Sequence, residues 1–299
     1  MKLRTRCKST IDALKANKML IWASDWEQLM RDNETIQSRL IKILDEVQFV
    51  FYDDQLEVLM RPHKLYNNNL HNANDFTPED CIGLLRKFFD KLEINADQLE
   101  VVNIEFGVNV KSPVEVKELI SCITYHDKNE FRNHVGLAYS KVSSSVNKYG
   151  RLNRYKQIKA YAKGVQYPQH CNRNTFRFEI KSDRRAYMIQ VLNVWSVSDL
   201  FDPLSYDIMS DLIISEWQRV LILQRQVDTS SLTKLEQKTI ERLTDSREWY
   251  EISQSHRNRF SKSKKRLEQL MKKTPQCYKS LLTTEIETKI ELLSVGCKF

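Results

Sequence analysis

The chain has 299 residues, of which 41% are hydrophobic and only 6 are Gly and 6 are Pro. This composition excludes a disordered or fibrous protein and is sufficient for one large or two ordinary domains. The formal charge of +8 is the difference between 47 basic and 39 acidic residues, a modest excess that favours a polyanionic partner without specifying a fold.

The cysteines and the hydropathy pattern exclude further classes. The six cysteines are scattered without a CxxC pair, so neither a zinc module nor a disulfide framework is indicated. The sequence has no run of about 18 apolar residues that could span a bilayer, and its basic N-terminus lacks the apolar segment of a signal peptide. We therefore expect a cytoplasmic protein without a membrane partner.

The N-terminal part is predicted to contain helix followed by two strands. Apolar residues recur at three- and four-residue spacing through 8–46, which predicts helices there. The segments 47–52 and 55–60 have the pattern of a hairpin or of two adjacent strands. The asparagine-rich run 67–75 is predicted to be a loop.

The middle of the chain alternates between helix and strand. Thr77 is a suitable N-cap for a helix that runs to about Leu92, because Pro and two acidic residues follow it. The segment 99–110 is the strongest predicted strand, and 114–125 is predicted to be helical. After a polar stretch, two further strands are predicted in the segments YKQIKAYAKG and NTFRFEIKS.

Strand signals end at about Asp183, and the remaining apolar patterns are helical. The predicted fold is therefore α+β: an antiparallel-rich central sheet flanked by helices, followed by an all-helical C-terminal region. We place a catalytic α+β domain at residues 1–200 and a helical region for DNA binding or oligomerisation at residues 201–299.

Two glutamates lie on predicted strands, with their side chains on the polar face. Glu105 alternates with an apolar set and lies two residues before Gly107, which leaves room for a close approach. Glu179 lies between Arg177 and Lys181 on the polar face of its strand. Exposed carboxylates and cross-strand charge pairs are the simple alternatives. Two such carboxylates from one sheet could also hold Mg²⁺ or Mn²⁺ while the cations hold phosphate.

A tyrosine follows the second of these strands. Tyr187 lies eight residues after Glu179, within reach of a metal site at the end of a sheet. A phenol needs local activation to attack a phosphodiester, because its ordinary pKa is about 10. The spacing is equally consistent with a packing residue on an amphipathic helix.

The segment 61–76 contains two histidines, His63 and His71. Nicking enzymes that bind a metal through two histidines on one strand need them two residues apart, and this chain has no such triplet. Both histidines are therefore interpreted as polar loop or strand-end residues, whereas Lys64 is a candidate phosphate contact.

The segment 256–273 carries eight Lys or Arg residues and one Glu. The simple interpretation is a solvated helix face. This density of positive charge is also sufficient for salt-sensitive, nonspecific contacts with a nucleic-acid backbone.

Four segments, in order along the chain, resemble the motifs of one protein family. HKLYNNNLHNANDF is similar to a K-F-x-x-G-x-N loop, NIEFGVNV to a glutamate-bearing strand, IKAYAKGVQ to a K-x-Y-D-K-G strand and NTFRFEIK to an L-R-F-E strand. Together they resemble the gene II type replication initiation proteins of phages and plasmids, in the version found on mobile elements of Bacteroidetes. The resemblance covers roughly residues 50–200. A more distant similarity is to the staphylococcal-type rolling-circle plasmid initiators.

This resemblance implies an enzyme that nicks and rejoins one DNA strand to start rolling-circle replication. Tyr187 would be the nucleophile, and Glu105 and Glu179 would hold Mg²⁺ or Mn²⁺. The DNA and phosphate contacts would come from basic residues: Lys64, Lys159, Lys163, Arg177 and Lys181. The implied partners are DNA, single-stranded or as an origin hairpin, and a host helicase or polymerase.

The sequence departs from the family pattern at two positions. Ala162 stands where the family often has an aspartate, which removes a third acid from the expected metal site. Asparagines at 67–69 replace the loop glycine, and Asn also adopts left-handed conformations. A noncatalytic DNA-binding or regulatory protein on the same scaffold is therefore the alternative.

Overall fold

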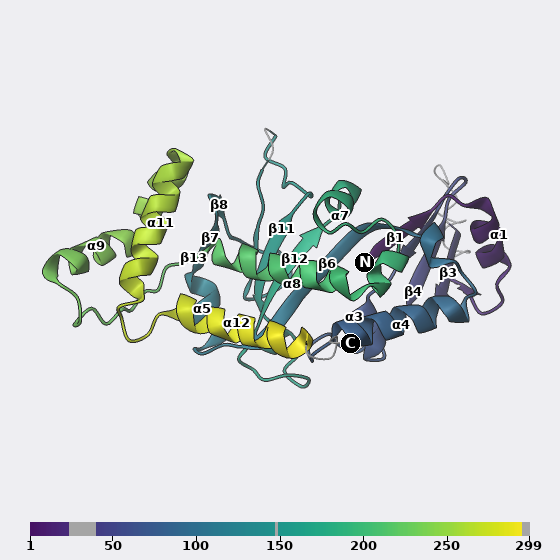
Figure 1. Cartoon of the computed structure of the whole chain (residues 1–299), viewed down its shortest axis with the longest axis horizontal. Coiled ribbons are helices and arrows are strands. Elements are labelled where there is room, and N and C mark those ends of the chain that lie inside the picture. The colour runs from purple at the N-terminus through teal and green to yellow at the C-terminus, as the bar shows by residue number, and fades with distance from the viewer. Residues whose placement is uncertain (24–39, 147–148, 295–299) are drawn as a thin grey trace. The chain divides into compact units, whose positions relative to one another are not determined.

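The computed structural model describes residues 1–23, 40–146 and 149–294 of the chain (Figure 1). The chain forms two compact units, each built from segments that are distant in the sequence. The first unit comprises Met1–Glu105, Ser182–Met209 and Leu293–Phe299, and the second comprises Phe106–Lys181 and Ser210–Leu292. Both units contain antiparallel strand pairs and helices, and helices dominate the C-terminal part, which confirms the predicted α+β class.

The first unit is built on an antiparallel sheet. Its strands, in spatial order, are β2 (Ile21–Trp22), β3 (Leu40–Leu44), β4 (Val47–Phe51), β5 (Leu56–Leu59), β1 (Lys2–Thr5) and the first half of β6 (Glu100–Lys111). The helical segments of this unit are α1 (Lys8–Ala16), α3 (Pro62–Tyr66), α4 (Pro78–Lys91), η1 (Ala96–Gln98), α7 (Arg185–Val191), η2 (Ser198–Phe201) and the start of α8 (Pro203–Gln218). The N-terminal strand β1 therefore lies between β5 and β6 and pairs antiparallel with both.

Strand β3 corrects the prediction of helix through 8–46. Asp45 and Glu46 have φ of 49° and 62°, and Leu44 pairs with Val47 across them. Two consecutive residues with positive φ form the tight turn that matches the twist of a hairpin. Cross-strand pairing with β4 therefore overrides the helical spacing of the apolar residues. The part of this prediction at 24–39 lies outside the described residues.

The predicted strands at 47–52 and 55–60 are confirmed as β4 and β5. The predicted helix after Thr77 is confirmed as α4, which begins with a capping box. The Thr77 hydroxyl accepts from the backbone N–H of Asp80, and the Asp80 carboxylate accepts from the backbone N–H of Thr77. Two N–H groups that lack partners within the helix are thereby satisfied.

The second unit contains a main sheet and a smaller, three-stranded sheet. The strands of the main sheet, in spatial order, are the second half of β6, β12 (Thr175–Ser182), β11 (Gln157–Ala162), β10 (Ser140–Ser143) and β9 (Arg132–Asn133). The three-stranded sheet consists of β13 (Val220–Ile222), β7 (Ile123–His126) and β8 (Asn129–Glu130). Its helices are α5 (Val116–Cys122), α6 (Lys163–Gln166), α9 (Lys234–Thr244), α10 (Ser246–Gln254), α11 (Arg257–Met271) and α12 (Tyr278–Ser294).

One apolar face of β12 is covered by the end of α8, which lies beside α12 (Figure 1). The buried indole of Trp217 packs edge-on against the rings of Phe176 and Phe178, at centroid distances of 5.9 and 5.2 Å. Its Nε1–H donates to Thr283 of α12 at 2.9 Å. The indole therefore packs on β12 and is hydrogen-bonded to α12.

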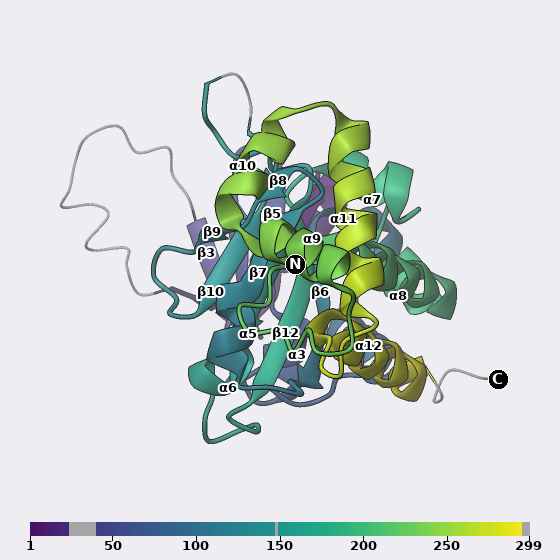
Figure 2. The same ribbon diagram turned by 90° about the vertical axis from the view of Figure 1, so that its left-hand side faces the viewer.

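Helices α9, α10 and α11 gather beside one another at the end of the second unit (Figure 2). Their shared core consists of buried apolar side chains: Leu232, Ile240, Leu243, Trp249, Ile252, Phe260, Leu267, Leu270 and Met271. Tyr125 and Leu221 of the three-stranded sheet belong to the same core. This packing fixes the helices on that sheet.

The three-stranded sheet corrects two predictions. The segment 114–125 forms α5 and then β7, because its last residues pair with β13. The same pairing forms a strand, β13, within the region after Asp183 that was predicted to be all helical. Among the described residues, no helix is both long and apolar enough to cross a bilayer.

Candidate functional site

The candidate site lies on the β11–β12 ladder of the second unit. Lys159 is directly opposite Glu179, and Tyr161 is directly opposite Arg177. Because side chains alternate along a strand, these four share one face of the ladder. Their register therefore places a carboxylate among cations and a phenol.

Glu179 is the centre of this cluster, and its carboxylate accepts three hydrogen bonds from side chains. Lys159 Nζ donates to Oε1 at 3.0 Å, and Arg177 Nε donates to Oε2 at 2.7 Å. The Tyr161 hydroxyl donates to Oε2 at 3.2 Å. Arg177 in turn donates from Nη1 to Asn109 Oδ1 of β6 at 3.1 Å. These contacts hold Glu179 in one position across three strands.

Lys163 extends the cluster at the end of β11. Its side chain is buried, and Nζ lies over the rings of Tyr161 and Tyr167, at 5.3 and 4.6 Å from their centroids. Nζ also donates to Gln166 Oε1 at 3.0 Å. Aromatic faces stabilise a desolvated ammonium, so the protein holds a positive charge here within a largely buried environment.

Gly107 allows β12 to approach β6 closely at Glu179. A Cβ atom at Gly107 would lie 2.3 Å from the carbonyl oxygen of Phe178 and 2.7 Å from Cα of Glu179. Real Cβ atoms essentially never come this close to backbone atoms. The space beside this glycine, which the sequence pattern indicated, is therefore filled by the backbone that carries Glu179.

The cluster places several positive charges in a protected position. Lys159 and Arg177 contact the Glu179 carboxylate, Lys163 lies over the Tyr161 ring, and Glu179 is only 2% exposed. Alternation predicted a solvated polar face, but the structure buries both faces of β12. Positive charge in a low-dielectric site attracts anions more strongly than on an open surface.

The cluster does not by itself fit a Mg²⁺ or Mn²⁺ ion. Such ions need several oxygen ligands, and both carboxylate oxygens of Glu179 already accept hydrogen bonds from other side chains. Within residues 1–23, 40–146 and 149–294, no group of three or more His, Cys, Asp or Glu residues could hold a metal ion. The metal-binding role of Glu179 stays a prediction.

Glu105 belongs to the first unit and is exposed on β6. A register shift between Lys2 and Leu3 of the neighbouring strand interrupts the alternation of β6 near Val102. The pattern of alternate burial is therefore irregular along this strand. The pairing of Glu105 with Glu179 in one metal site stays a prediction.

Tyr187 lies in α7 of the first unit and is 2% exposed. The start of this helix is fixed by Arg185, which donates to the carbonyl oxygen of Trp195 at 3.1 Å and forms an ion pair with Glu100 at 3.4 Å. Along the chain, Tyr187 follows β12. Its role as nucleophile stays a prediction, as do those of Lys64 on α3 and Lys181 on β12.

The loop after α3 has the backbone geometry that its asparagines allow. Asn68 and Asn69 have φ of 52° and 64°, which is the left-handed conformation expected where the family has glycine. His63 stacks on Phe76 at a centroid distance of 4.7 Å, and its Nε2 lies 2.9 Å from Asn74 Oδ1. His63 therefore organises the loop through stacking and an amide contact.

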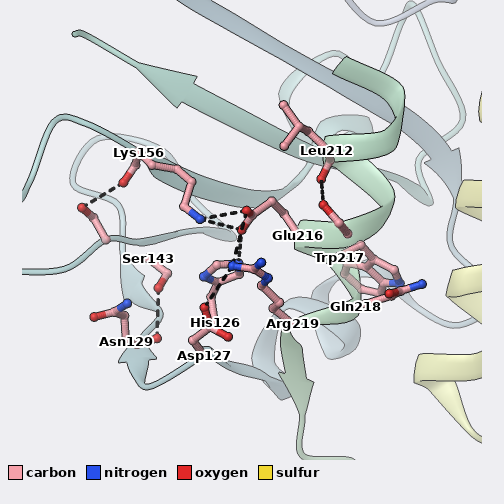
Figure 3. A network of polar contacts seen from close by, with 12 residues as sticks. His126, Asp127, Asn129, Ser143, Lys156, Leu212, Glu216, Trp217, Gln218 and Arg219 are labelled. Carbon is pink, nitrogen blue, oxygen red and sulfur yellow. Dashed lines mark hydrogen bonds and ion pairs between the residues drawn. The ribbon is translucent and has the colours of Figure 1, made fainter. Parts of the chain in front are cut away.

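A second buried polar network, which the sequence did not indicate, surrounds Glu216 at the end of α8 (Figure 3). Lys156 Nζ donates to both carboxylate oxygens, at 2.8 and 2.9 Å. His126 Nε2 lies 2.7 Å from Oε2, and Arg219 Nη1 lies 3.7 Å from Oε1. Lys156 and His126 lie far from Glu216 in the sequence, so no local motif could have revealed their contacts.

The network changes the acidity of Glu216. Burial alone raises the pKa of this carboxyl, but hydrogen bonds from His126 and Lys156 outweigh it and lower the pKa from 4.5 to about 2. The carboxylate is therefore ionised throughout the physiological pH range. It links α8 to β7 and to the segment before β11 as a structural ion cluster.

Comparisons with known proteins give one structural similarity. No family model matches the chain, and no curated protein matches its sequence. The fold is similar to a rolling circle replication initiator protein from Geobacillus stearothermophilus, with a TM-score of 0.37 and 11% sequence identity. The alignment covers 88% of this chain and 94% of that protein.

Proposed function

We propose that this protein is a replication initiator that nicks and rejoins one DNA strand through a phosphotyrosyl intermediate. The observation that carries the proposal is the protected cluster on β11 and β12, in which Lys159 and Arg177 converge on Glu179. These strands are the ones whose sequences resemble the initiator motifs. The ordered resemblance of four segments supports the same family.

In the proposed reaction the Tyr187 oxygen attacks the phosphorus of one phosphodiester. The phenol loses its proton, the new bond joins tyrosine to the 5′ phosphate, and the leaving strand ends in a 3′ hydroxyl that primes synthesis. The covalent intermediate keeps the strand available for rejoining. Because Tyr187 is buried in the structure, DNA binding must expose its hydroxyl before attack.

Lys159, Lys163 and Arg177 are proposed to hold phosphoryl oxygens in this reaction. Guanidinium and ammonium groups stabilise the charge that develops on those oxygens. Glu179 positions two of these cations through the ion pairs already formed. Lys64 and Lys181 are proposed as further contacts along the DNA backbone.

A divalent ion, Mg²⁺ or Mn²⁺, is part of the proposal because the family resemblance implies it, with Glu105 and Glu179 as its carboxylates. When bound, such an ion would neutralise phosphoryl charge. Loss of nicking in a chelator and its recovery with either ion would support this requirement. Nicking at full rate in the chelator would contradict it and leave the tyrosine mechanism intact.

The test uses supercoiled plasmid that carries the origin of the protein's own genetic element. We expect nicked circles and a covalent protein–DNA adduct from the wild type, and neither product from Tyr187→Phe. Tyr250→Phe is the matched control, because Tyr250 is 64% exposed on α10. If the wild type gives no nick and no adduct, the proposed activity is wrong. Normal nicking by Tyr187→Phe would reject only the choice of nucleophile.

A noncatalytic DNA-binding or regulatory function is the second candidate. It is favoured by one observation, that both carboxylate oxygens of Glu179 bond to neighbouring side chains. In that case Glu179 has a structural role only, and DNA binding requires the cations but no metal. Origin binding by Glu105→Gln with wild-type affinity, together with no nicking by the wild type, would favour this function.

A further inference from the structure

Helix α11 presents a surface of uncompensated positive charge. Between Arg257 and Met271 it has six Lys or Arg residues and one acid, Glu268. Lys264 forms an ion pair with Glu268, with 3.0 Å between Nζ and Oε1. The remaining cations of the helix are exposed and form no ion pair within the described part of the chain: Arg257, Arg259, Lys262, Lys265 and Arg266.

The neighbouring helices of the same unit do not share this property. Helix α9 has three basic and two acidic residues, and its Glu236 pairs with Lys273 at 2.6 Å. Helix α12 has two basic and three acidic residues. The excess of positive charge is therefore specific to α11 and not a general feature of this helical region.

The exposed cations share one face of α11. At 100° per residue, Arg259, Lys262, Lys265 and Arg266 lie within one arc, which faces away from the buried stripe containing Leu267. Like charges three and four residues apart destabilise a helix, and Lys262 has such neighbours at 259, 265 and 266. A bound polyanion would remove this repulsion.

The position of the helix is fixed by its own unit. Lys264 Nζ donates to the carbonyl oxygen of Gln218 at 2.6 Å, and Lys128 Nζ donates to that of Ser255 just before α11 at 2.6 Å. Phe260 packs edge-on against Tyr125 and Trp249, at centroid distances of 6.0 and 5.2 Å. The charged face is therefore presented by a rigid support, with its orientation set before any partner binds.

Two polyanions are candidates for this face, and the structure favours nucleic acid over a lipid surface. A helix that lies in a membrane interface exposes an apolar face beside its cations. On α11 the apolar side chains, Phe260, Leu267, Leu270 and Met271, are all buried in the protein core. A nucleic-acid backbone needs only the cations.

We propose that the exposed face of α11, formed by Arg259, Lys262, Lys265 and Arg266, binds the phosphate backbone of duplex DNA without reading its sequence. The choice of DNA among nucleic acids rests on the proposed function. This surface holds duplex DNA and has no part in the chemistry. Successive cations along it rise by about 1.5 to 4.5 Å along the helix axis, so the face can meet several phosphates.

The test measures binding of a short random-sequence duplex at several salt concentrations, in a chelator so that no cleavage occurs. The variant is Lys262→Gln/Lys265→Gln/Arg266→Gln. The matched control removes three exposed cations of the first unit, as Lys8→Gln/Lys18→Gln/Lys87→Gln. We expect the slope of log K against log salt to fall in magnitude by about 3 in the α11 variant, since each phosphate contact contributes about 0.9. The control should keep the wild-type slope.

A charge-conserving variant, Lys262→Arg/Lys265→Arg/Arg266→Lys, should also keep that slope, because phosphate contacts require charge and not a particular side chain. An unchanged slope in the α11 glutamine variant, or an equal fall in the control, would overturn the proposal. A fall confined to a single-stranded probe would overturn the assignment to duplex. Because the probe carries no origin and is not cut, these outcomes are independent of whether the protein nicks DNA.

Discussion

The ion cluster at Glu216 leads to a prediction about acid stability that uses the geometry of the second unit. Glu216→Gln keeps the size of the side chain and removes its charge. His126 and Lys156 then face a neutral amide in a largely buried position. We expect the variant to be less stable than the wild type at neutral pH, because one partner of a buried charge cluster has been removed.

The size of the effect follows from the shift in pKa. The pKa of Glu216 falls from 4.5 to about 2 on folding, and one pKa unit corresponds to about 1.4 kcal/mol. The ionised carboxylate therefore stabilises the fold by about 3.5 kcal/mol at most. Lys156 is partly exposed, with 28% of its side chain accessible, and solvent screening reduces the expected loss to about 2–3 kcal/mol.

The direction of the pH dependence follows from the depressed pKa. A carboxyl whose pKa is lower in the folded state contributes its stability above the unfolded value of 4.5 and loses it as pH falls toward about 2. The difference in free energy of unfolding between wild type and Glu216→Gln should therefore be constant above about pH 5 and shrink steadily below it.

Urea unfolding at a series of pH values, followed by circular dichroism and tryptophan fluorescence, measures this difference. Glu241→Gln is the control, because Glu241 is exposed on α9 and surface substitutions of this kind change stability by no more than about 0.5 kcal/mol. A difference for Glu216→Gln that stays constant from pH 7 to pH 2 would refute the coupling of this charge cluster to folding.

Four further substitutions test the strand approach at Gly107, the packing of Trp217 and the capping of α4. Gly107→Ala should lower the free energy of unfolding by about 1–3 kcal/mol in chemical denaturation, because the new Cβ would lie 2.3 Å from the Phe178 carbonyl oxygen. Gly83→Ala in α4 is the control: its new Cβ would have no atom within 4 Å, and the substitution should raise the free energy of unfolding by about 0.5–1 kcal/mol. Equal stability of the two alanine variants would contradict the close strand approach. Trp217→Ala should cost about 3–5 kcal/mol through the cavity that it leaves, and a loss below 1 kcal/mol would argue against its place in the core. Thr77→Ala should lower the thermal midpoint through loss of about 1 kcal/mol of capping energy, and an unchanged midpoint would speak against the capping box.

Alternation along the strand was sufficient to predict that Arg177 and Glu179 share a face of β12. It could not predict that both faces are buried, because burial depends on what packs above the sheet. The contact of Lys159 with Glu179 depends on strand register, which the pattern of one strand does not contain. The residue types of the cluster were therefore predictable from the sequence, whereas its ion pairs depend on the register of the folded strands.

The errors at β3 and β7 have one physical cause. Apolar residues at helical spacing can also pair across strands when a partner strand is close. The hairpin turn at Asp45 and Glu46 lacks the glycine that usually marks such turns. The partner of β7 lies in β13, far along the chain. The His126 contact with Glu216 depends on the same tertiary arrangement and left no signal in the sequence.

The most direct test of the proposed function is to identify the residue that becomes linked to DNA. The wild-type protein is incubated with its own origin and Mg²⁺ or Mn²⁺, the adduct is digested with nuclease and protease, and the modified peptide is sequenced by mass spectrometry. We expect one peptide with a nucleotide attached through the 5′ phosphate to Tyr187. Complete recovery of unmodified Tyr187 peptide from a reaction that has nicked the plasmid would contradict the proposed nucleophile, and the absence of any nick or adduct would contradict the proposed activity.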